Sequence, residues 1–187
     1  MRWTRLFDDL EAQLIRLEQA ELAADISDRV RYERGQVSLL ETLSADCGRT
    51  IAIEAQEIGS LTGVLREVGQ DWCILESTTA GSVRQRAVLL PAAAIQSLTG
   101  LSGFADQRES ASQRRFGIRS ALRALGRDRA MVRVYLTGGG TVQGTIDRIG
   151  EDHIDVADHP DDAPRRAAEV RAVHTVPLWA ICALRQV

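Results

Sequence analysis

The stretch of residues 132–156 constrains the fold more than any other part of the chain. Apolar Val132, Val134 and Leu136 alternate with other residues, which is the pattern of a half-buried strand. The three glycines at 138–140 then predict a tight reversal, because glycine tolerates positive φ without steric cost. A second strand, another glycine turn and a third strand follow. The stretch therefore predicts an antiparallel meander.

The meander pattern occurs a second time, earlier in the chain. When the sequence is shifted so that Gly63 lies on Gly144, the apolar strand positions of the two stretches also coincide. A slightly larger shift places the Pro-x-x-Ala-Ile element of residues 91–95 on residues 177–181. Turn glycines that stay in register over roughly fifty residues favour an internal duplication. Two unrelated meanders that share only generic strand patterning are the alternative.

Composition places the chain among ordinary soluble proteins. Its 187 residues can bury a core as one compact domain or as two small ones. Hydrophobic residues make up 44%, charged residues 26%, and the net charge is −3. No apolar run approaches the roughly 18 residues of a membrane span, and acidic residues interrupt the N-terminus where a signal peptide would be apolar. Three scattered cysteines, with no pattern of disulfide pairs, predict that the protein resides in a reducing cytoplasm. All basic residues are arginine, which indicates a GC-rich bacterial genome.

Residues 1–46 are predicted to be helical. Five large apolar residues follow the alternating spacing of four and three that places them on one stripe of a helix. The stripe can pack on the rest of the chain or on the matching helix of a partner chain, and a coiled-coil dimer fits the spacing. These candidate partner-binding residues are Trp3, Phe7, Leu10, Leu14 and Leu17.

The strand patterns divide the rest of the chain. A first five-strand unit is predicted over residues 47–101, a connector that becomes helical over 102–128, and a second five-strand unit over 129–187. Trp72 and Trp179 are expected to pack in the core or between the units. We therefore predict an α+β protein in which a long N-terminal helix, able to bend, is followed by two tandem helix-plus-five-strand barrels.

The second copy resembles the Sm-like fold and, within it, the bacterial Hfq branch. The resemblance rests on VRVYL at 132–136, on VQGTI at 142–146 and on the Ala-Ile pair at 180–181. It implies a small SH3-like barrel that binds uridine-rich or adenine-rich RNA. The arrangement is also similar to an uncharacterised actinobacterial family sometimes labelled Fis-like regulators. That label implies a helix-turn-helix, and none is apparent in the sequence.

The nucleotide-contacting residues of the Sm-like families are mostly absent from this chain. Where Hfq proteins carry a Lys-His pair, the second copy has Leu178 and Trp179. Where the Sm branch uses Asp and Asn, the second copy has Gly150 and Ile154. Gln143 alone keeps a residue type used near the Hfq pocket. Without cationic and amide groups for phosphates and base edges, the usual RNA pocket is not expected.

An arginine-rich stretch supplies a different candidate for RNA binding. Four of its arginines are spaced by four residues on or beside the predicted connector helix, which gives a cationic ridge. A solvated face that pairs with the acidic N-terminal section is the alternative. The candidate nucleic-acid-binding residues are Arg114, Arg115, Arg119, Arg123, Arg127 and Gln143.

The sequence offers no pattern of catalytic or cofactor-binding residues. A cluster of metal-ligand residue types occurs near the third strand of the second unit, but ordinary strand-end polar residues explain it better. Its members are Asp152, His153, Asp155, His159 and Asp161. We therefore expect no enzyme, no metal and no cofactor.

The combined observations predict a cytoplasmic, non-enzymatic binding or scaffolding module. Protein–protein interaction through the N-terminal stripe and open strand edges is the leading hypothesis. RNA binding through the arginine-rich connector helix is the alternative. We expect no membrane contact, and a monomer or small homo-oligomer in which the N-terminal helix is buried.

Overall fold

The computed structural model describes Gln19, Leu22 and residues 25–32, 35–77, 86–103, 116–159 and 170–187. Two compact units divide the chain, one of residues 1–38 and one of residues 39–187. In the first unit, residues 25–32 are helical. Most of the helix predicted there, including the stripe from Trp3 to Leu17, lies outside the described residues.

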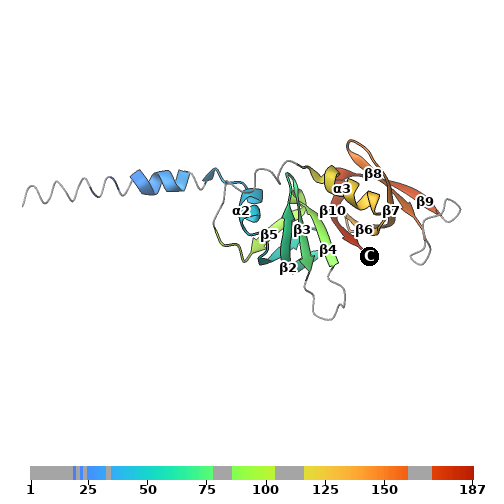
Figure 1. The fold of residues 1–187 in the computed structure, drawn as a ribbon, viewed down its shortest axis with the longest axis horizontal. Coiled ribbons are helices and arrows are strands. Elements are labelled where there is room, and N and C mark those ends of the chain that lie inside the picture. Colours follow the sequence, from blue (N-terminus) through green and yellow to red (C-terminus); the bar gives the residue numbers. More distant parts are fainter. Residues whose placement is uncertain are drawn as a thin grey trace, which may run out of the picture. The chain divides into compact units, whose positions relative to one another are not determined.

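One antiparallel sheet of ten strands dominates the second unit (Figure 1). Along the sheet the strands follow the order β5-β1-β2-β3-β4-β10-β6-β7-β8-β9. The first five strands in the chain are β1 (Thr50–Ala55), β2 (Gly59–Val68), β3 (Trp72–Ser77), β4 (Arg86–Pro91) and β5 (Ile95–Thr99). The last five are β6 (Met131–Leu136), β7 (Thr141–Ile149), β8 (His153–Asp158), β9 (Ala172–Pro177) and β10 (Ile181–Gln186).

Short helices connect or cover the strands. Helix α2 spans Leu39–Ala45 and precedes β1, whereas α3 spans Ile118–Arg127 and precedes β6. The 3-10 turns η1 (Ala92–Ala94) and η4 (Leu178–Ala180) each follow a proline and lead into β5 and β10. A proline there fits, because its fixed φ suits the extended backbone before the turn.

The predicted fold, a long N-terminal helix followed by two tandem barrels, is wrong. Strands β4 and β10 pair with each other, Leu89 opposite Leu184 and Val88 opposite Arg185, so both groups of strands belong to one open sheet. The physical reason is that β4 and β10 each have one unpaired row of N–H and C=O groups, and pairing satisfies both rows. The small Sm-like barrel repeat is therefore replaced by a ten-stranded sheet. Residues 36–38, directly before α2, are not helical.

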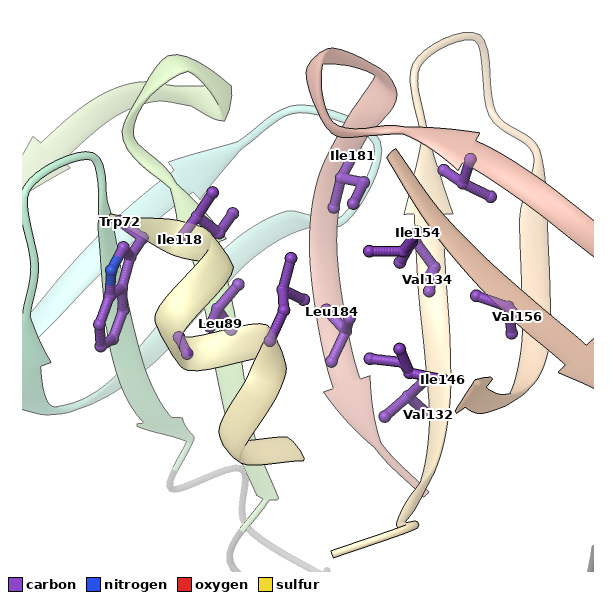
Figure 2. Close-up of a cluster of buried hydrophobic side chains, with 13 residues drawn as sticks. Trp72, Leu89, Ile118, Val132, Val134, Ile146, Ile154, Val156, Ile181 and Leu184 are labelled. Atoms are coloured by element: carbon purple, nitrogen blue, oxygen red, sulfur yellow. The ribbon is translucent and has the colours of Figure 1, made fainter. Parts of the chain in front are cut away.

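Two apolar clusters pack on the sheet, and each takes side chains from both groups of strands. The cluster beneath α3 joins Trp72 and Leu89 to Ile154 and Leu184 (Figure 2). The cluster beneath α2 is built mainly on β1–β4 but includes Ala183 of β10. The seam between β4 and β10 is thus buried on both faces. Full burial of each large apolar side chain contributes about 1.5–3 kcal/mol, so this seam is a substantial part of the core.

Candidate partner-binding groove

The turn between β2 and β3 fixes the start of helix α3. The Ile118 backbone N–H donates to Asp71 Oδ1 at 2.7 Å, which satisfies one of the free donors of the first helical turn. The indole Nε1 of Trp72 donates to the Phe116 carbonyl at 3.0 Å, and the Gln70 backbone N–H donates to the same oxygen. Residues far apart in the sequence are therefore held together at this end of the helix.

A groove of about 350 Å³ lies between α3 and strands β3, β4 and β10. Its floor is apolar and buried, formed by Trp72, Leu89 and Leu184. Phe116 lies at the groove with 59% of its surface exposed, which is unusual for so large an apolar side chain. The other lining residues are Glu67, Ile74, Ala87, Ser120, Ala121, Ala124, Leu125 and Gln186.

Few polar groups line this groove, so its chemistry is that of an apolar binding site. Glu67 and Gln186 are exposed, and Glu67 is the one acidic side chain among the described residues that line the groove. An apolar side chain placed over Trp72 would lose contact with water, and a nearby cation would meet the Glu67 carboxylate.

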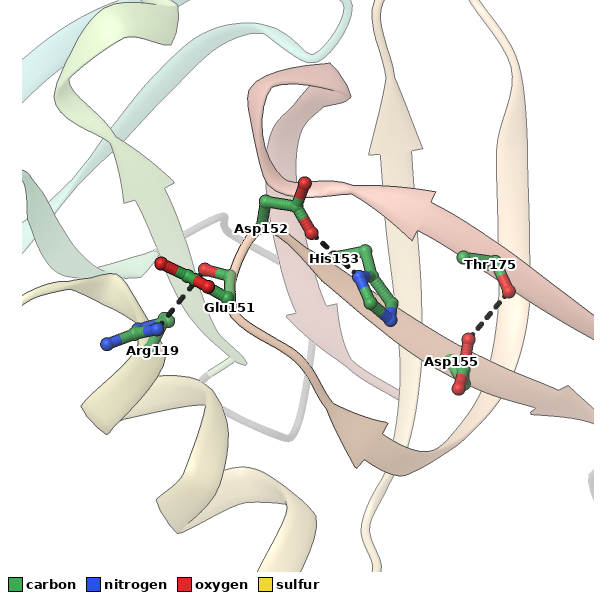
Figure 3. Close-up of polar contacts among 6 residues, drawn as sticks. All are labelled: Arg119, Glu151, Asp152, His153, Asp155 and Thr175. Carbon is green, nitrogen blue, oxygen red and sulfur yellow. Dashed lines mark hydrogen bonds and ion pairs between the residues drawn. The ribbon is translucent and has the colours of Figure 1, made fainter.

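The predicted arginine ridge is only partly described. Arg114 and Arg115 lie outside the described residues, whereas Arg119, Arg123 and Arg127 lie on α3. Arg119 Nη1 donates to the Glu151 carbonyl at 3.3 Å (Figure 3).

Acidic residues flank the described arginines of this ridge. Arg123 and Arg127 line one hollow together with Asp147. Arg119 and Arg123 line another together with Asp71 and Glu151. These carboxylates reduce the positive potential along α3, since opposite charges at short range offset each other.

Gln143 lies apart from the arginines of α3. Along β7, Val142 and Ile146 belong to the cluster beneath α3, and Gln143 points to the opposite face because side chains alternate along a strand. Its Oε1 accepts hydrogen bonds from Arg133 Nε and Nη2, at 2.9 and 2.6 Å. The structure therefore does not bring Gln143 and the ridge together as one nucleic-acid site.

The metal-ligand residue types near β8 are engaged in separate contacts (Figure 3). His153 Nδ1 lies 2.8 Å from Asp152 Oδ1, and this hydrogen bond lowers the pKa of the Asp152 carboxyl. Thr175 Oγ1 donates to Asp155 Oδ1 at 2.6 Å, and His159 Nε2 lies 2.7 Å from a buried threonine hydroxyl. Asp161 lies outside the described residues, among which no three His, Cys, Asp or Glu side chains form a metal-binding group.

Apolar side chains are also exposed outside the groove. Trp179, on η4, is 80% exposed, so the expectation that it packs in the core or between the units is wrong. In the first unit, Leu22, Ile26 and Val30 are exposed and spaced by four, which places them on one side of a helix. The five predicted stripe residues from Trp3 to Leu17 lie outside the described residues.

The two outer strands of the sheet, β5 and β9, have unpaired edges. Within the described part of the chain, β5 pairs with β1 alone and β9 with β8 alone. Val173 on β9 is exposed, and the strand carries no acidic or arginine side chain to discourage pairing. A strand edge of this kind can accept the backbone of a partner.

The sequence matches no protein-family model and no curated protein. Nothing in these comparisons identifies an Sm-like family, so that resemblance rests on the motifs alone. Among the described helices, none is long and apolar enough to cross a membrane.

The three cysteines differ in their expected reactivity. Burial raises the pKa of the Cys73 thiol to about 12, and Cys182 is also buried. Cys47 is exposed, although partial burial, Glu67 and Asp46 raise the pKa of its thiol.

At neutral pH we expect the Cys47 thiol alone to react, and slowly, in the folded protein, because the thiolate is the reactive form. After unfolding in urea we expect all three cysteines to react. Thionitrobenzoate release measures this stoichiometry, and two or more reactive thiols in the folded protein would contradict it.

Proposed function

We propose that this chain is a cytoplasmic, non-enzymatic binding or scaffolding protein that holds a protein partner. The observation that carries the proposal is the apolar groove beside α3, with Trp72 in its floor and exposed Phe116 beside it. Pockets with aromatic anchors are where protein interfaces concentrate their binding energy. The free state of all three cysteines supports the cytoplasmic part of the proposal.

The partner segment is expected to combine a large aliphatic or aromatic side chain with a neighbouring lysine or arginine. The apolar floor favours the first, because contact with Trp72 and Leu184 removes apolar surface from water. Glu67 favours the second, because it is an exposed carboxylate among the groove residues. The exposed edge of β9 gives the partner's backbone a second place to bind.

RNA binding through the ridge on α3 is the weaker candidate. Asp71, Asp147 and Glu151 line the same hollows as its arginines, and they would repel phosphates. Among the described residues that line these hollows, Phe116 is the one aromatic, so few bases could stack there.

A peptide-display selection against the full chain tests the proposed groove. We expect the selected peptides to share an apolar residue beside a basic one. Ala124→Glu should weaken their binding at least about tenfold, since a longer, charged side chain would fill part of the apolar groove and lose water when the peptide's apolar residue binds. Glu67→Gln should weaken binding about 2–5-fold, the effect of an exposed ion pair. Titration calorimetry with the selected peptides measures both effects.

Ala93→Glu is the matched control for the groove variant. Ala93 is exposed on η1 and does not line the groove, so the same substitution there should leave peptide affinity unchanged. Far-UV circular dichroism checks that both variants are folded. Failure to select any peptide, or equal weakening by the two variants, would show that the groove is not the binding surface.

A further inference from the structure

Two arginines lie directly opposite each other on neighbouring strands. Arg133 of β6 pairs in register with Arg185 of β10, so both side chains project from the same face of the sheet. Directly opposite residues have Cβ atoms about 4.5–5.5 Å apart, and like charges at such positions are destabilising. Both arginines are half-buried, so water screens the repulsion only in part.

Some arginines of the described chain pair with carboxylates, whereas Arg133 and Arg185 do not. Arg49 lies beside Asp46, and Arg66 pairs with Glu76. Among the described residues, neither Arg133 nor Arg185 forms an ion pair with an acidic side chain. Two half-buried arginines in register therefore lack a compensating acidic side chain in the described part of the chain.

Neutral groups orient the two guanidinium groups. Arg133 donates through Nε and Nη2 to Gln143 Oε1, and Gln143 lies opposite it on β7. The Arg185 guanidinium carbon lies 6.0 Å from the centre of the Tyr135 ring, within the range of a cation–π contact. Arg185 Nε is buried and has no hydrogen-bond partner in the described part of the chain. These contacts orient the two side chains, and no carboxylate offsets their charge in the described part of the chain.

We propose that Arg133 and Arg185 together bind a phosphate group. Guanidinium donors match phosphate oxygens in a planar, two-bonded geometry, and a phosphate carries enough negative charge to offset both arginines. The phosphate can belong to a free phosphomonoester or to the phosphodiester backbone of a nucleic acid. This site lies on the face of the sheet opposite α3 and is independent of the partner-binding groove.

Binding of three probes to the full chain tests the site. Inorganic phosphate, adenosine monophosphate and a short oligothymidylate are titrated at low ionic strength, with sodium chloride at matched ionic strength as the blank. We expect at least one probe to raise the melting temperature above the blank. Arg133→Gln and Arg185→Gln should each lower its affinity at least about tenfold, because each removes charge-assisted hydrogen bonds.

Substitutions on α3 provide the control. Arg123→Gln and Arg127→Gln make the same change of charge at exposed positions and should leave the affinity within about twofold. Equal binding of the monophosphate and the oligonucleotide assigns the site to a phosphomonoester, whereas tighter, salt-dependent binding of the oligonucleotide assigns it to a phosphodiester. If Arg185→Gln does not fold, the affinities of Arg133→Gln and Arg185→Lys are measured instead. Lysine keeps the positive charge but lacks the planar donors of arginine. No response above the blank, or equal losses from the control variants, would overturn the proposal.

Discussion

Replacing Trp72 with alanine is expected to lower the free energy of unfolding by about 3–5 kcal/mol, the cost typical of removing a large buried aromatic side chain. Trp72 is only 3% exposed and packs in the cluster beneath α3. Its indole N–H also holds the Phe116 carbonyl, so the variant loses one of the contacts that fix the start of α3. Urea unfolding followed by far-UV circular dichroism measures the loss.

Trp179→Ala is the matched control for this prediction. Trp179 is 80% exposed and belongs to neither apolar cluster, so its replacement should change the free energy of unfolding by no more than about 0.5 kcal/mol. Similar values for the two tryptophan variants would mean that Trp72 does not anchor α3 on the sheet.

Local patterns in the sequence predicted the strands well. The alternation at Val132, Val134 and Leu136 and the glycines that follow place β6 and β7 within one or two residues of where they lie. These signals work because side-chain alternation and positive φ are properties of a few neighbouring residues. Within the connector predicted over residues 102–128, the helix that the structure describes is α3, Ile118–Arg127.

The joining of the two groups of strands was not predicted. Pairing of β4 with β10 is made by backbone N–H and C=O groups, which every residue carries, so no side-chain pattern indicates it. A partial signal existed in β3, where Trp72 and Ile74 alternate with Cys73 and Leu75. A strand that is apolar on both faces requires cover on both faces, and here α3 and α2 with their clusters provide it.

The candidate sites depend on the same long-range information. Phe116 and Trp72 meet only because the turn before β3 holds the start of α3. Arg133 and Arg185 become neighbours only through the register of β6 with β10. Gln143 was identified from its sequence motif, but it lies opposite Arg133 only because β6 pairs with β7. Residue types could therefore be proposed from the sequence, whereas their grouping into sites could not.

Gly144→Ala is expected to lower the free energy of unfolding by about 1–3 kcal/mol, because a side chain at this position has no room. Gly144 is buried in β7, and an added Cβ would fall well inside contact distance of the Ala157 carbonyl oxygen on β8. The obstacle is backbone, which cannot rotate aside as a flexible side chain could. Either β7 moves away from β8, or the hydrogen bonds between the two strands are distorted.

Gly140→Ala, in the hairpin that leads into the same strand, separates this steric effect from the general cost of replacing a glycine. The nearest atom to a Cβ at Gly140 is Leu136 Cδ1, at an ordinary 3.7 Å, so this variant should stay within about 0.5 kcal/mol of the original protein. Chemical denaturation of both variants gives the comparison. If Gly144→Ala proved as stable as Gly140→Ala, β7 and β8 could not approach each other as closely as the structure requires, and the sheet would have to be wider at this point.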